Sequence, residues 1–172
     1  MKYLIVGRPN VGKSSIFNIL TGRKTNIIHK KKGTTRDWHR DEIRLIKNSF
    51  IFDVPGIILN PSNDDEKKTK RIIESLIPNI NYLLFVVDFH FYSFNEDVVI
   101  LQWLRTFNRK IVLLVNKKDN NKQNVNTDFY KYGINNIFFL SCSHRLGFDK
   151  LRKFLKDKIN HKSNKLINKH EN

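Results

Sequence analysis

Apolar and polar positions along the chain alternate between short, nearly continuous hydrophobic runs and segments with helical periodicity. Runs such as YLLFVVD and IVLLVN are typical of strands buried on both faces of a parallel sheet. The predicted strands lie near residues 2–6, 40–46, 49–53, 82–88, 110–116 and 136–141. The predicted helices lie at 13–21, 66–77, 95–107, 126–132 and 147–160. This alternation predicts an α/β fold, a three-layer sandwich around a mostly parallel six-stranded sheet, with a hairpin between the second and third strands.

The helical periodicity near the C-terminus ends at about residue 160. Phe148, Leu151 and Leu155 fall on one apolar face of the last predicted helix, and no such face continues past residue 161. We therefore predict one domain over residues 1–160 and a basic tail over residues 161–172 that frays. A chain of 172 residues with 40% hydrophobic composition is long enough for a single core.

Features of membrane, secreted and metal-cluster proteins are missing from the sequence. No apolar run approaches the ~20 residues that a membrane span requires, and nothing resembles a signal peptide. Cys142 is the single cysteine, so no disulfide within the chain is possible, and no Cys/His cluster has metal-ligand spacing. These features predict a cytoplasmic protein with no membrane partner, and a monomer is the default expectation.

The formal net charge of +16 is typical of proteins that bind nucleic acids. The sequence is also crowded with Lys, Asn and Ile, as expected from a genome poor in G and C, so composition alone accounts for part of the charge. The excess is uneven, because residues 150–170 carry many cations. An anionic partner is therefore predicted.

The carboxyl ends of parallel strands form the ligand-binding edge of such sheets. GRPNVGKSS follows the first strand and has the spacing G-x-x-x-x-G-K-S. Backbone N–H groups and the helix N-terminus would surround phosphates, Lys13 would reach the β and γ phosphates, and Ser14 would ligate Mg²⁺. The alternative is a chance match in an ordinary turn, which the strand-loop-helix context disfavours. The predicted contacts are Gly7, Asn10, Val11, Gly12, Lys13, Ser14 and Ser15.

Two further segments have the chemistry of a triphosphate and magnesium site. The third predicted strand ends in Asp53-Val54-Pro55-Gly56, where Asp53 would hold the Mg²⁺ shell and the Gly56 N–H would meet a γ-phosphate oxygen. Taken alone this is a good turn sequence, and its place after a strand favours the functional interpretation. In the segment GTTRD at 33–37, Thr35 would close over the γ-phosphate and ligate Mg²⁺. The lysines at 30–32 are interpreted as a solvated charge run.

Two segments predict a guanine site. Asn116-Lys117-Lys118-Asp119 follows the fifth strand, and Asp119 would accept hydrogen bonds from guanine N1–H and N2 that adenine does not offer. Ser141-Cys142-Ser143 follows the sixth strand, where the Cys142 N–H would read guanine O6. The alternative, Cys142 as a nucleophile, lacks an evident His or acid to activate it.

All five segments occur in the order found in G domains, and the chain resembles the first G domain of the bacterial Der (EngA) GTPases. The resemblance spans about residues 2–158 and rests on GRPNVGKSSIFNILTGRK, GTTRD, YLLFVVD, ILQWLR, LLVNKKD and SCSHRLGFDKL. The first two blocks are shared with Era and MnmE, and the W-L-R helix favours Der. The resemblance implies a P-loop NTPase that binds GTP and GDP with Mg²⁺ and couples GTP hydrolysis to large-subunit assembly, with the large ribosomal subunit and its rRNA as partners. Three features depart from it: the sequence covers neither the second G domain nor the KH-like domain of Der proteins, Lys110-Ile111 replaces the Pro usual before the strand that leads to NKKD, and DVPG replaces D-T-[GP]-G.

The hydrolysis step raises one further expectation. Many GTPases have a water-orienting Gln after the D-x-x-G segment, and here Ile57 stands in its place. The resemblance implies that Asn10 helps ligate K⁺ beside the phosphates, where the ion substitutes for an arginine finger. The catalytic assignments are therefore Lys13, Thr35, Gly56 and Asn10. The alternative for Asn10 is a purely local role in the loop turn.

Two other functions stay open at this point. One is a hydrolytically weak GTP/GDP-binding module that docks on RNA through its basic surface, which Ile57 and the absent domains favour. The other is an Era-like or MnmE-like GTPase with a different RNA partner.

Overall fold

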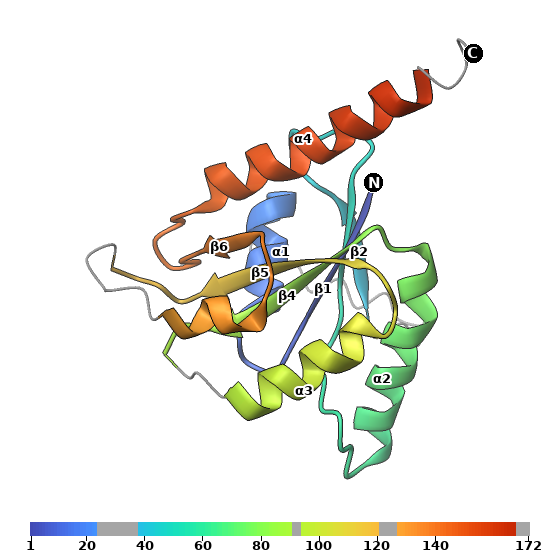
Figure 1. The fold of residues 1–172 in the computed structure, drawn as a ribbon, viewed down its shortest axis with the longest axis vertical. Coiled ribbons are helices and arrows are strands. Elements are labelled where there is room, and N and C mark those ends of the chain that lie inside the picture. Colours follow the sequence, from blue (N-terminus) through green and yellow to red (C-terminus); the bar gives the residue numbers. More distant parts are fainter. Residues whose placement is uncertain (24–37, 91–93, 121–126, 168–172) are drawn as a thin grey trace.

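A computed structural model of the chain describes residues 1–23, 38–90, 94–120 and 127–167 (Figure 1). The elements in chain order are β1 (Lys2–Gly7), α1 (Lys13–Thr21), β2 (His39–Glu42), β3 (Phe50–Asp53), α2 (Asp64–Leu76), η1 (Ile77–Asn79), β4 (Tyr82–Asp88), α3 (Phe94–Arg105), β5 (Lys110–Asn116), η2 (Thr127–Tyr132), β6 (Ile137–Phe139) and α4 (Phe148–Ile167). The strands form one six-stranded sheet in the order β2-β3-β1-β4-β5-β6. Only the β2–β3 pair is antiparallel, so the predicted mostly parallel sheet is confirmed.

Helices cover both faces of the sheet, which gives the predicted three layers (Figure 1). On one face, Ile16 and Leu20 of α1 and Leu151 of α4 pack in one apolar cluster. On the other, Ile73 of α2 and Leu104 of α3 pack in a second cluster. The strands between the two clusters are buried on both sides, because β4 has no residue outside the buried class. This accounts for the continuous apolar runs in the sequence.

The hairpin between the second and third strands is present, but its first strand is shorter and earlier than predicted. β2 ends at Glu42, which pairs with Phe50, and the connection between them was predicted as strand as far as residue 46. Leu45 and Asn48 have φ values of 68° and 57° in this connection. A left-handed backbone cannot continue a strand, so the apolar pattern of IRLI is overridden locally.

Other elements also differ from the predictions in their ends or in helix type. α2 begins at Asp64 because Asn63 caps it, accepting a hydrogen bond from the Glu66 N–H at 2.9 Å. Residues 127–132 form a 3-10 helix in place of the predicted α-helix. The last helix, α4, continues to Ile167, past the predicted end at residue 160. Within the described residues, no helix is long and apolar enough to cross a membrane.

This arrangement places several predicted site segments at one edge. β1, β3, β4 and β5 are mutually parallel along the sheet, so their carboxyl ends at Gly7, Asp53, Asp88 and Asn116 share an edge. The loop that follows β6 returns to the same edge, because Lys118 donates its backbone N–H to the Leu140 carbonyl. The fold therefore brings together segments that are far apart in the sequence.

Candidate nucleotide site

The loop between β1 and α1 has a backbone that only a few residue types permit. Gly12 has a φ of 97°, and a Cβ placed there would lie 2.1 Å from the side-chain nitrogen of Asn116. That nitrogen donates to the Val11 carbonyl at 2.9 Å, so the end of β5 braces the loop. Asn10 also has a positive φ, 64°, in the region that Asn tolerates better than most residues. The loop geometry thus gives Asn10 a structural role whether or not it binds an ion.

Lys13 is buried at the start of α1, with 6% of its surface exposed. Its ammonium donates to the Arg8 carbonyl at 2.8 Å. Burial lowers the pKa of Lys13 to about 8, although the Asp53 carboxylate acts in the opposite direction. Among the described residues, the ammonium donates one hydrogen bond, to this carbonyl. An anionic acceptor in the loop could therefore replace the carbonyl as its partner.

The carboxylate that ends β3 lies beside this loop. Asp53 is 5% exposed, and its Oδ1 is buried with no hydrogen-bond partner among the described residues. Burial raises the pKa of this carboxyl, while the Ser14 hydroxyl and then Lys13 lower it. An unmatched carboxylate oxygen beside a serine hydroxyl fits a hard cation such as Mg²⁺, which prefers oxygen ligands.

The DVPG turn touches the phosphate loop directly. A Cβ on Gly56 would lie 2.4 Å from the Pro9 nitrogen, so only glycine permits this approach. The Ile57 N–H donates to the Gly7 carbonyl at 3.0 Å, which closes the turn against β1. The Ile57 side chain is 1% exposed and packs among the apolar residues beneath the sheet. It therefore makes no contact with solvent and has no group that could orient water.

The segment after β5 meets the segment after β6 at a shared carboxylate. Asp119 Oδ1 accepts hydrogen bonds from Ser141 Oγ at 2.6 Å and from Ser143 Oγ at 2.8 Å. These two hydroxyls, Ser141 first, lower the pKa of Asp119, so the carboxylate is ionised at neutral pH. Lys117 has a φ of 68°, and its ammonium lies 2.6 Å from the Asp88 carboxylate at the end of β4.

Sequence reasoning missed the role of the two serines, although it placed their segment correctly. It assigned the segment through the Cys142 backbone, whereas the side chains on either side fix the orientation of Asp119. The Cys142 thiol itself is unreactive in character, because burial raises its pKa to about 11. This disfavours the alternative in which Cys142 is a nucleophile.

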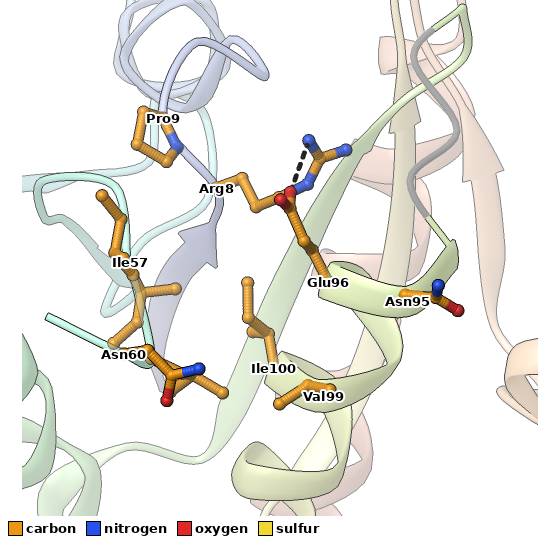
Figure 2. Close-up of a pocket in the computed structure, with 10 residues that line it drawn as sticks. Arg8, Pro9, Ile57, Asn60, Asn95, Glu96, Val99 and Ile100 are labelled. Atoms are coloured by element: carbon orange, nitrogen blue, oxygen red, sulfur yellow. Dashed lines mark ion pairs between the residues drawn. The ribbon is translucent and has the colours of Figure 1, made fainter.

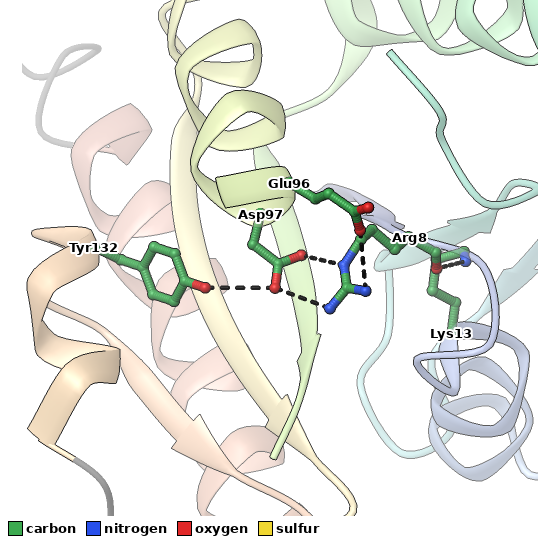
Figure 3. Close-up of polar contacts among 5 residues, drawn as sticks. All are labelled: Arg8, Lys13, Glu96, Asp97 and Tyr132. Atoms are coloured by element: carbon green, nitrogen blue, oxygen red, sulfur yellow. Dashed lines mark hydrogen bonds and ion pairs between the residues drawn. The ribbon is translucent and has the colours of Figure 1, made fainter. Parts of the chain in front are cut away.

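Arg8 ties the phosphate loop to α3 through an ion pair that the sequence analysis did not foresee (Figure 3). Its Nε and Nη2 donate to the two oxygens of Asp97 at 2.7 and 3.1 Å. Its Nη1 lies 3.3 Å from Glu96, and Tyr132 of η2 donates to Asp97 at 3.4 Å. Asp97 is fully buried, which raises the pKa of its carboxyl, and the hydrogen bond from Arg8 lowers it. The loop is therefore anchored from two other elements.

One signal in the sequence could have found this ion pair. Asp97 shares a face of α3 with Ile100 and Leu104, three and seven residues further on. A carboxylate on the apolar face of an amphipathic helix needs a cationic partner inside the fold.

A separate cavity of about 480 Å³ lies on the far side of Arg8, between the start of α3 and residues 57–60 (Figure 2). Its walls are mostly apolar and include Ile58, Val99 and Ile100. None of the predicted nucleotide contacts lines it, so it is distinct from the loops described above.

The structure brings together the predicted residues of four segments. The loop from Gly7 to Ser15, the DVPG turn, NKKD and SCS converge at the carboxyl edge of the sheet. Thr35, together with the rest of the GTTRD segment and the lysines at 30–32, lies outside the described residues.

Known proteins resemble this chain in both sequence and structure. The family described as "50S ribosome-binding GTPase" matches residues 2–117. GTPase Der of Thermosipho melanesiensis is 35% identical over 151 residues, covering 86% of this chain and 35% of that protein. The chain spans about a third of the length of the curated relatives it matches, and so resembles a single G domain of Der.

Solved structures share the fold. Era in complex with MgGDPNP and nucleotides 1506–1542 of 16S ribosomal RNA is 27% identical, with a TM-score of 0.73 over 91% of this chain and 55% of that chain. NFeoB from S. thermophilus bound to GDP·AlF₄⁻ and K⁺ is 24% identical, with a TM-score of 0.69 over 89% of this chain and 60% of that chain. The family match over most of the sheet, with the phosphate loop at its carboxyl edge, shows that the chain belongs to the 50S ribosome-binding GTPase family.

Proposed function

We propose that this chain binds GTP and GDP with Mg²⁺ and hydrolyses GTP. One observation carries the proposal: the phosphate loop, the Asp53 carboxylate and the serine-held Asp119 converge at one edge of the sheet. The first two provide the groups that bind phosphate and Mg²⁺, and the third provides the groups that recognise a base. An adenine nucleotide would offer the Asp119 carboxylate no donors from the base, a large cost for a polar group oriented in advance.

The guanine end of the site is organised before any nucleotide arrives. Ser141 and Ser143 both donate to Asp119 Oδ1, which leaves Oδ2 facing neither serine. That oxygen and the remaining capacity of Oδ1 are the acceptors for guanine N1–H and N2. Asn116 holds the phosphate loop through Val11, and the Cys142 N–H is assigned to guanine O6.

The phosphate end has the groups that phosphoryl transfer requires. Lys13 would leave the Arg8 carbonyl for the β and γ phosphates, where anionic oxygens are stronger acceptors. Mg²⁺, when bound, neutralises charge on these oxygens, and Ser14 and Asp53 would hold it together with Thr35. The orphaned Asp53 Oδ1 supports that assignment. The Gly56 N–H would bind a γ-phosphate oxygen.

Hydrolysis by the chain alone is expected to be slow, because the buried Ile57 cannot orient water. We assign K⁺ binding to Asn10, which is exposed in the phosphate loop and has a positive φ. NFeoB, which has a similar fold, was crystallised with K⁺ and GDP·AlF₄⁻. Turnover in KCl should exceed turnover in NaCl at equal ionic strength. Equal rates in the two salts would remove K⁺ from the mechanism.

We further propose that the GTPase acts in assembly of the large ribosomal subunit, in the cytoplasm. Support comes from the family description and from the similarity to GTPase Der. Era, a structural relative, was crystallised with a segment of ribosomal RNA. Single-turnover GTP hydrolysis with purified large or small subunits tests this assignment. Large subunits should accelerate GTP hydrolysis, and small subunits should not. No acceleration by either subunit would contradict a function in large-subunit assembly.

The second candidate is a GTP/GDP-binding module that docks on RNA with little hydrolysis, and the burial of Ile57 favours it. The same experiment separates the two functions. Nucleotide-dependent binding to subunits without accelerated hydrolysis would select the second candidate.

A further inference from the structure

A second cavity, of about 460 Å³, lies at the end of the sheet opposite the nucleotide site. Tyr82 and Lys110, which begin β4 and β5 and pair with each other, form part of its wall. The predicted base-binding residues stand at the other end of these seven-residue strands. At about 3.3 Å per residue, the two sites are about 20 Å apart. A ligand in this cavity would not touch the nucleotide.

The lining of this cavity is strongly cationic. Five segments of the fold contribute: the start of β4, the end of α3 with the turn that follows it, the start of β5, the connection between η2 and β6, and α4. Its lining residues are Tyr82, Arg105, Arg109, Lys110, Ile111, Gly133, Ile134, Asn135, Asn136 and Lys158. Four of these ten residues are cations and none is acidic, so the cavity suits a polar, anionic ligand rather than an apolar one.

The four cations are held by neutral groups. Arg105 donates to the Tyr132 carbonyl at 2.6 Å, and Arg109 donates to the Pro78 carbonyl at 2.9 Å. The Lys110 ammonium lies 5.6 Å from the centroid of the Tyr82 ring. Lys158 similarly stacks over an aromatic ring, 4.9 Å from its centroid. These contacts fix the positions of the cations without neutralising their charges.

This differs from the ion pairs found elsewhere in the described residues. Five cations outside the cavity are paired with carboxylates: Arg8 with Asp97, Arg23 with Asp41, Lys67 with Asp64, Lys117 with Asp88 and Lys131 with Asp128. Other cations, such as Arg152 and Lys70, resemble those of the cavity in contacting carbonyls or an aromatic ring, but they are not gathered around one cavity. Arg109 also has a buried Nε with no hydrogen-bond partner among the described residues. An unmatched buried donor costs free energy, so the fold gains little from holding this guanidinium here.

We propose that this basic cavity, defined by Arg105, Arg109, Lys110 and Lys158, binds the phosphodiester backbone of RNA. Several separated cations in an open groove match a polyanion, which presents successive phosphates, better than a single small anion. Asn135 and Asn136 in the same wall offer amide groups to phosphate or ribose oxygens. The choice of RNA over other polyanions rests on the proposed ribosomal function.

The test compares two double variants, each of which removes two positive charges from a different part of the surface. Lys110→Gln with Lys158→Gln removes two cavity cations whose ammonium groups contact aromatic rings within the described residues and not, as Arg105 and Arg109 do, backbone carbonyls. Lys70→Gln with Arg71→Gln removes two cations from α2, where Lys70 lies 5.9 Å from the Trp103 ring in a comparable contact. Binding of a fluorescein-labelled poly(U) RNA of about 16 nucleotides is followed by anisotropy. Sodium chloride is varied between about 50 and 200 mM.

A plot of log K for RNA binding against log salt concentration has a negative slope, and each phosphate contact to a single strand contributes about 0.7 to its magnitude. In the cavity variant, which loses two such contacts, the magnitude of this slope should be smaller by about 1.4. The α2 variant should keep the wild-type slope. Equal losses in both variants, or no loss in either, would overturn the proposal. So would wild-type binding to phosphatidylserine vesicles without binding to RNA.

Affinity for GDP, measured on the same samples, separates this proposal from the nucleotide function. Both variants should bind GDP as the wild type does, because neither site of substitution touches the loops described above. RNA binding through the cavity by a protein that fails to bind GDP would refute the nucleotide function and leave the cavity assignment standing.

Discussion

Replacing Asp97 with Asn should destabilise the folded chain substantially, although the side chain keeps its shape. The Asp97 carboxylate is fully buried and binds Arg8 through two hydrogen bonds, at 2.7 and 3.1 Å. Removing one partner of a buried ion pair costs about 3–5 kcal/mol. Asn retains one acceptor oxygen, and Arg8 retains Glu96 at 3.3 Å. We therefore expect the free energy of unfolding to decrease by about 3 kcal/mol, the lower end of this range.

Glu96→Gln is the matched control, because it removes the other carboxylate that contacts Arg8. The Glu96 side chain is 66% exposed, so its ion pair should contribute less than about 1 kcal/mol. Urea unfolding of both variants measures the difference. With a slope of about 2 kcal/mol/M, Asp97→Asn should lower the midpoint by about 1.5 M.

The same reasoning predicts weaker GDP binding by Asp97→Asn, since Arg8 carries the carbonyl that positions Lys13 in the phosphate loop. A midpoint for Asp97→Asn that matches the Glu96→Gln midpoint would refute the claim that the buried pair anchors this loop.

Three further predictions follow from the other groups of the site. Asp119→Asn should shift nucleotide preference from guanine toward xanthine, measured by competition against labelled GDP, and an unchanged preference would contradict the assigned base site. The pKa of Lys13 is about 8 in the nucleotide-free fold and 10.5 as its ordinary value, so the unfolded chain binds more protons between these pH values. Stability should therefore rise with pH across that window, by up to about 3 kcal/mol, and Lys13→Met should lack the rise when unfolding is measured at pH 8 and pH 10. Because burial raises the pKa of Cys142 to about 11, a disulfide reagent at pH 8 should modify folded protein far more slowly than urea-unfolded protein, and equal rates would show that the thiol is exposed.

The sheet and the edge that carries the site were predictable because local signals agreed with the global fold. Runs such as YLLFVVD leave little choice but a strand buried on both sides, and β4 is found where that run predicts it. GRPNVGKSS and NKKD are short motifs whose spacing is fixed by the ligand, so they need no information about distant residues. Their positions after strands then placed them on a common edge.

Features that depend on backbone torsion or on distant partners were not predictable in this way. The apolar pattern of IRLI predicts a strand, but Leu45 and Asn48 adopt left-handed conformations that end it. The Arg8–Asp97 pair joins residues 89 positions apart, so no local pattern specifies it. The hydrogen bond from Ser141 to Asp119 likewise exists only because the sheet places β5 beside β6.

The central claim is that the edge of this sheet is a guanine nucleotide site. Isothermal titration of the wild-type chain with GDP and with ADP, each with Mg²⁺, tests it most directly. A site built to satisfy Asp119 should prefer GDP by about 10⁴-fold, the discrimination expected when the wrong ligand leaves polar groups unpaired. Similar affinities for GDP and ADP, or no binding of either, would contradict the account.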